Sequence, residues 1–109
     1  MAIDTIKEYG EKAGKSELAS ILKKELPSRL YSFKQDKIMP HQYHIYRKFP
    51  FNLVSDACAV VYIYKKDSML KDEIVLYKEK YPLLEKLANK IAEKFSKIKG
   101  REMTVRYAN

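Results

Sequence analysis

The sequence predicts an α+β fold, with a mainly antiparallel sheet of 4–5 strands, an N-terminal helical hairpin and a long C-terminal helix packed on one face. Three observations support it: apolar residues recur at helical spacing near both ends, the middle of the chain alternates apolar and polar residues, and residues 57–64 are almost wholly apolar. No repeat, low-complexity tract or linker interrupts the 109 residues. We therefore expect a single domain over residues 1–109.

Two short helices are expected at the N-terminus, the first over residues 3–13. The residues at helical spacing are Ile3, Ile6, Tyr9 and Ala13 in the first helix and Leu18, Ile21, Leu22 and Leu26 in the second. Gly14 can end the first helix, because glycine adopts the left-handed conformation without steric cost. Ser16 is expected to cap the second helix through its hydroxyl, and Pro27 to close it.

Four strands are expected between residues 30 and 79. The alternating apolar positions are Tyr31 and Phe33 in the first strand and Tyr43, Ile45 and Phe49 in the second. The third strand, at residues 57–64, is apolar at nearly every position, so both of its faces are covered or one of them binds something. A charged turn at residues 65–71 leads to the fourth strand at residues 73–78.

The C-terminal part predicts a long helix and a last strand. Pro82 suits the first turn of the helix, and Gly100 ends it. The apolar stripe between them is formed by Leu84, Leu87, Ala88, Ile91, Phe95 and Ile98. Residues 102–107 alternate again, so a β-α-β crossover is expected only here. With all helices on one face of the sheet, the opposite face would be free.

The charge balance predicts an anionic partner. Eighteen lysines and four arginines against fourteen acidic residues leave a formal net charge of +8. Such a surplus attracts polyanions, with nucleic acid as the first expected partner and anionic lipid as the second. Abundant Lys and Glu with few amides are typical of proteins from hot environments. That thermophile-like composition explains many charges of both signs, but it does not explain an excess of one sign.

Other features concern the cellular compartment. The single cysteine, Cys58, excludes an internal disulfide and an all-cysteine metal cage. No apolar run approaches the roughly 20 residues of a bilayer span, and the start of the sequence lacks the pattern of a signal peptide. We expect a cytoplasmic protein without integral membrane association.

No catalytic motif is recognisable, so we expect no enzyme activity, no cofactor and no bound metal. Residues 10–16 approach a phosphate-binding loop, but three residues separate the two glycines where that loop has four. His41 and His44 would point in opposite directions on a strand, because their spacing is odd. The carboxylates suited to acid–base chemistry lack a patterned spacing, and they are Asp36, Asp56, Asp67, Asp72 and Glu73. An enzyme would require a metal-assisted site around the two histidines and Asp56.

Nine tyrosines supply the remaining signal, and several stand beside basic residues. A tyrosine ring can stack on a base while a neighbouring lysine or arginine neutralises phosphate. If the helices cover the face with Ala59, Val61 and Ile63, then Tyr62 and Tyr64 point to the free face. The predicted nucleic-acid-binding residues are Tyr46, Arg47, Lys48, Tyr62, Tyr64 and Arg106. His44 could join them by alternation.

The sequence thus favours a small basic module that binds DNA or RNA by neutralising phosphates and stacking bases. The alternative is a homodimeric protein-interaction or inhibitor module that uses the same tyrosine-rich sheet face, or residues 49–51, against a protein. Tyrosine is enriched at protein interfaces for the same amphipathic reason that suits it to stacking. A continuous basic face would favour the first hypothesis, and an apolar tyrosine face the second.

Overall fold

The computed structural model describes residues 2–39, 41–48, 57–77 and 82–108. In chain order, its elements are α1 (Ala2–Ala13), α2 (Lys15–Glu25), β1 (Tyr31–Gln35), β2 (Gln42–Arg47), β3 (Ala59–Tyr62), β4 (Asp72–Leu76), α3 (Pro82–Lys99) and β5 (Met103–Tyr107). This is the predicted order of helices and strands. No helix within these ranges combines the length and apolarity needed to cross a bilayer.

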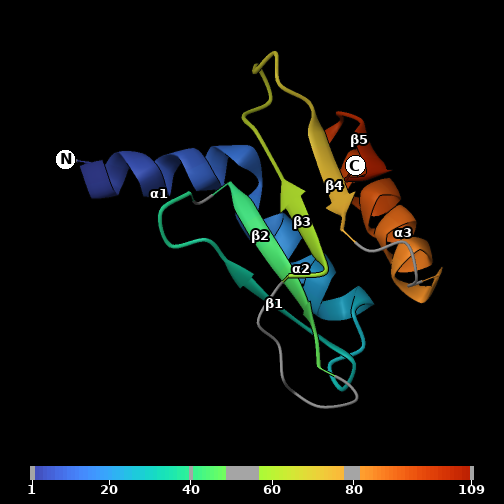
Figure 1. Cartoon of the computed structure of the whole chain (residues 1–109). Coiled ribbons are helices and arrows are strands. Elements are labelled where there is room, and N and C mark those ends of the chain that lie inside the picture. The colour runs from blue at the N-terminus through green and yellow to red at the C-terminus, as the bar shows by residue number, and fades with distance from the viewer. Residues whose placement is uncertain (1, 40, 49–56, 78–81, 109) are drawn as a thin grey trace.

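The five strands form one sheet in the order β1-β2-β3-β4-β5. Neighbours from β1 to β4 are antiparallel, whereas β4 and β5 are parallel. A parallel pair needs a crossover connection, and α3 lies between these two strands in the chain. The sheet is therefore mixed but mostly antiparallel, and the predicted α+β fold class is confirmed (Figure 1).

The helices pack on one face of the sheet, where α2 lies behind β2 and β3 in Figure 1 and α1 extends to the left from the start of α2. The register aligns Tyr43, Val61, Ile74 and Val105 across four strands on this side. The largest fully buried apolar side chains of this layer are Leu18, Leu22, Ile45, Val61, Ile63, Ile74, Leu76, Leu84, Ile91 and Phe95. Burial of the alanine and valine side of β3 against the helices is as predicted.

A single residue, Gly14, connects α1 to α2. Gly14 adopts φ +94°, a left-handed conformation, and a Cβ there would lie only 2.9 Å from Phe95 Cζ. Glycine thus meets both a backbone and a packing requirement. The predicted capping role of Ser16 is wrong, because α2 begins at Lys15 and Gly14 holds the N-cap position without a side-chain hydrogen bond. The Ser16 hydroxyl donates instead to Glu11 Oε2 at 2.7 Å.

Three strands differ from the predicted limits: β3 begins at Ala59 rather than at residue 57, β5 begins at Met103 rather than at residue 102, and β4 is shifted as well. β3 ends at Tyr62, although the apolar pattern continues to Tyr64. The Tyr64 N–H donates to the Asp72 carboxylate at 2.8 Å rather than to a neighbouring strand, so a side chain ends the ladder. β4 begins one residue earlier than predicted, at Asp72. Phe49, predicted to lie in the second strand, is outside the described residues.

Candidate nucleic-acid interface

The predicted tyrosine surface lies on the sheet face that no described helix covers, which we call the helix-free face. One row of paired residues crosses all five strands on this face, and it consists of Lys34, His44, Val60, Val75 and Arg106. With about 4.8 Å between neighbouring strands, the row spans roughly 19 Å. It therefore has a basic residue at each end and an apolar centre.

Tyr46 lies on one side of this row, next to His44 on β2. The two rings stack with centroids 6.4 Å apart and planes inclined at 28°. His44 Nε2 lies 3.1 Å from Asp36 Oδ2, in the turn between β1 and β2. Backbone N–H groups of Met39 and Ile38, with His44, hold the pKa of Asp36 below its usual value. The turn thus anchors the aromatic pair through its aspartate.

Tyr62 lies on the other side of the row, at the end of β3. A hydrogen bond with Tyr77, together with burial, raises the pKa of Tyr62 to about 12. Tyr62 pairs with Glu73 in the register, whereas Tyr77 follows the end of β4. The paired Val60 and Val75 lie between the two tyrosines in the register, and each valine is only 3% exposed. The centre of the face thus combines two tyrosines with two buried valines.

Ion pairing reduces the positive charge of this face. The Arg106 guanidinium donates to both carboxylate oxygens of Glu73, at 2.9 and 3.3 Å. This contact raises the pKa of Arg106 and leaves the arginine side chain about half exposed. Lys34 is exposed at the opposite edge. The face thus combines aromatic rings with cations at its two edges, and its electrostatic potential is not uniformly basic.

Two of the predicted binding residues do not join this face. Alternation along β2 turns Arg47 to the same side as Tyr43 and Ile45, where its register partner is Tyr31. Lys48 lies beyond the end of β2, and its ammonium donates to the Ser28 carbonyl at 2.8 Å. Sequence proximity to Tyr46 therefore did not bring these two cations to the tyrosine surface.

Tyr64 is also separate from Tyr46. Its ring lies against His41 with centroids 5.4 Å apart, and His41 in turn meets Tyr9 of α1 at 5.6 Å. Burial raises the pKa of Tyr64 and lowers that of His41. Because β3 has ended by this point, Tyr64 lies at the turn end of the sheet rather than in its central rows.

The two histidines have different environments: His41 packs between tyrosines, whereas His44 contacts Asp36. Only His44 is in β2, because His41 precedes Gln42, so the predicted alternation along one strand does not apply to the pair. In the part of the chain that the structure describes, no group of three His, Cys, Asp or Glu side chains could hold a metal ion. Asp56, the predicted third member, lies outside that part. Cys58 is buried, and its thiol donates to the Ile45 carbonyl at 3.3 Å.

Sequence reasoning missed Lys34 and Tyr77 as members of the helix-free face. Alternation along the strands could have identified both. Lys34 lies two residues after Ser32, and Tyr77 lies two residues after Val75, so each shares a face with that residue. The sequence-based prediction instead favoured tyrosines that adjoin cations along the chain. Comparison with known proteins gives no relative, since no family model, curated protein or solved structure matches the chain.

Proposed function

We propose that the protein binds single-stranded DNA or RNA on the helix-free face of its sheet. The observation that carries this proposal is the row with Lys34 and Arg106 at its ends, flanked by Tyr46 on one side and Tyr62 on the other. Bases would stack on the tyrosines, and the two cations would contact phosphates along the strand. The net charge of +8 supports this proposal, because it draws a polyanion toward the molecule.

The proposed function is binding without covalent chemistry. Base stacking tolerates any sequence, since every base has a flat face, so we expect little discrimination among bases. The proposed location is the cytoplasm, where a single buried thiol such as Cys58 needs no protection from oxidation.

The test compares tyrosines from the two faces of the same sheet. We expect Tyr46→Leu and Tyr62→Leu each to weaken binding of a labelled single-stranded oligonucleotide by about 5- to 150-fold, since stacking on a ring contributes about 1–3 kcal/mol. Fluorescence anisotropy measures the affinity, and circular dichroism checks that each variant folds. The matched control is Tyr107→Leu, because Tyr107 is on β5 and contacts Glu85 of α3 on the opposite side.

An unchanged affinity in both helix-free-face variants would contradict the proposal. A loss of affinity in Tyr107→Leu as large as in the other two variants would contradict it as well. Absence of any binding at low salt would exclude nucleic acid as the ligand.

A second candidate function is homodimerisation through the same face. It is favoured by the pairing of Arg106 with Glu73, which offsets charge beside an apolar centre of Val60 and Val75. Tyrosine anchors often dominate such interfaces. Sedimentation of the wild type as a dimer, and of Tyr62→Leu as a monomer, would support this function over nucleic-acid binding.

A further inference from the structure

Exposed apolar side chains are concentrated at one end of the sheet. Among the described residues, seven large hydrophobic side chains are exposed, and four of them are Ile38, Met39, Met69 and Leu70. The first two belong to the turn between β1 and β2, and the other two to the turn between β3 and β4. Both turns lie at the same end of the sheet. This end is marked by the pairing of Gln42, the first residue of β2, with Tyr62, the last residue of β3.

The turn between β3 and β4 is the more exposed of the two, and Figure 1 shows it projecting beyond the sheet. Met69 is 98% exposed and Leu70 is 59% exposed. Exposure of aliphatic side chains to water is unfavourable by the hydrophobic effect. A ligand that buries Met69 and Leu70 would therefore gain binding free energy from removing them from water.

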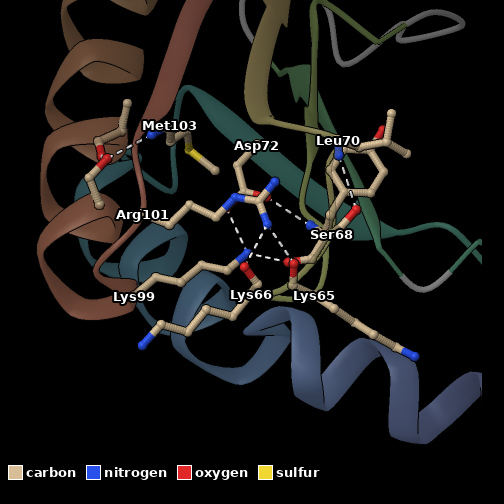
Figure 2. Close-up of polar contacts among 11 residues, drawn as sticks. Lys65, Lys66, Ser68, Leu70, Asp72, Lys99, Arg101 and Met103 are labelled. Carbon is tan, nitrogen blue, oxygen red and sulfur yellow. Dashed lines mark hydrogen bonds and ion pairs between the residues drawn. The ribbon is translucent and has the colours of Figure 1, made fainter.

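This turn is held in place by cations from the end of α3 and the segment after it. Arg101 Nη1 donates to the carbonyls of Lys65 and Lys66 at 2.6 and 3.1 Å. Lys99 donates to the Tyr64 carbonyl and forms an ion pair with Asp72 at 2.6 Å. Figure 2 shows the Lys99 and Arg101 side chains converging on the start of the turn, beside Lys65 and Lys66. These bonds fix the base of the turn that carries the apolar tip, Met69 and Leu70. Less conformational entropy is therefore lost when the turn binds a ligand.

Lysines lie beside the apolar tip. A hollow of about 560 Å³ at the base of the turn is lined by Lys12, Lys65, Lys66 and Asp67. Lys71 is exposed where the turn enters β4, and Lys37 precedes Ile38 in the other turn. The ligand that fits this end must therefore combine negative charge with an apolar phase.

We propose that this end of the sheet docks on an anionic membrane surface. The apolar tips, Ile38-Met39 and Met69-Leu70, enter the boundary between headgroups and acyl chains, and Lys65 and Lys66 at the hollow receive phosphate headgroups, since Lys12 is paired with Glu8 at 2.8 Å. A nucleic acid would satisfy the lysines, but it offers no apolar phase to two separate aliphatic tips. The proposal goes beyond nucleic-acid binding, since its residues are not those of the helix-free face.

A tryptophan placed at the tip tests insertion directly, because the chain contains no tryptophan. We expect the emission of Met69→Trp to shift to the blue when vesicles of phosphatidylcholine and phosphatidylglycerol are added, and not with phosphatidylcholine alone. The matched control is Leu83→Trp, at an exposed apolar position of α3. α3 follows β4, so Leu83 lies near the opposite end of the sheet, and its emission should not change.

Vesicle sedimentation gives the second measurement. Met69→Gln combined with Leu70→Gln should weaken binding to the anionic vesicles by at least about tenfold, since two inserted side chains are lost. Leu83→Gln should bind like the wild type. No blue shift at position 69, or equal binding by the tip variant and the wild type, would overturn the proposal. Loss of oligonucleotide affinity with unchanged vesicle binding would also overturn it, assigning the tip to nucleic acid.

Discussion

At the centre of the helix-free face, the neighbouring Tyr77 hydroxyl and burial raise the pKa of Tyr62 to about 12. Tyr62 ends β3 and Tyr77 follows β4, and the paired Val60 and Val75 lie between them in the register. An interaction with Tyr77 restrains the hydroxyl of Tyr62. A ring restrained in this way is oriented before any ligand arrives, which favours either stacking or a protein contact. The protonation state of Tyr62 reports on this arrangement.

We predict that Tyr77→Phe lowers the pKa of Tyr62 from about 12 toward the usual value of 10. The folded-state pKa of Tyr62 lies above its unfolded value, so its contribution to stability is complete below pH 10. That contribution is lost as the pH rises toward 12. The variant should therefore lose less stability over this interval than the wild type does.

Phenolate absorbance measures the titration, and chemical denaturation at several pH values measures the stability. Tyr46→Phe serves as the control and should leave the Tyr62 titration unchanged, because the Tyr46 ring stacks on His44. An unchanged Tyr62 titration in Tyr77→Phe would refute the coupling.

At the scale of the elements, one buried ion pair joins α3 to the start of β4. Asp72 is fully buried, and the side chain of Lys99 is 7% exposed. Burial lowers the pKa of Lys99, and Asp72 opposes this effect. Asp72 also accepts from the Tyr64 N–H, so the pair joins α3, β4 and the end of β3. A buried pair of this kind orients elements even where its net stabilisation is small.

We predict that Lys99→Met lowers the free energy of unfolding by about 3–5 kcal/mol, because it leaves the Asp72 carboxylate buried without its cation. Lys97→Met is the matched control. Lys97 is on the same helix, but its pair with Glu93 is exposed, so the change should stay within about 0.5 kcal/mol. Urea denaturation of both variants provides the comparison, and similar losses would contradict a special role for the buried pair.

At the scale of the whole molecule, the positive charge is spread over both layers. In the helical layer, α3 carries Lys90 and Lys94, and both pair with Glu25 at the end of α2. The edges of the sheet carry Lys34 and Arg106, and the turns carry further lysines. A net charge of +8 spread in this way draws polyanions toward the molecule without selecting one surface, so the proposed nucleic-acid site depends on individual contacts.

We predict that oligonucleotide affinity falls steeply between about 50 and 200 mM salt, because phosphate contacts release condensed counterions. Arg106→Gln should reduce the slope of log affinity against log salt by about one, as loss of one phosphate contact requires. Arg29→Gln removes the same charge from a position outside the strands and should leave the slope unchanged. Equal slopes in the wild type and Arg106→Gln would place the phosphates elsewhere.

The long C-terminal helix shows how well local pattern predicts an element. Pro82 and Gly100 mark its limits, and the structure has α3 over Pro82–Lys99. The limits of β3 were less predictable, since Ile63 and Tyr64 continue its apolar pattern. The Asp72 side chain ends that strand from eight residues away along the chain. No pattern within residues 57–64 records that contact.

The candidate site divides in the same way. Alternation along β3 correctly placed Tyr62 on the face of the sheet opposite to that of Val61. Adjacency in sequence did not correctly place Lys48 beside Tyr46, because the Lys48 ammonium binds the Ser28 carbonyl instead. Arg106 reached the predicted face because β5 pairs in register with β4.

Short-range physics decided the order of elements and the side of β3 that packs on helices, since side-chain periodicity and glycine or proline sterics involve residues close together in the chain. Folding in three dimensions decided that Tyr62 meets Tyr77, that Asp72 pairs with Lys99, and that Tyr64 turns toward His41. These contacts join residues from different elements. They depend on strand register and on where each strand ends, which packing among distant segments sets.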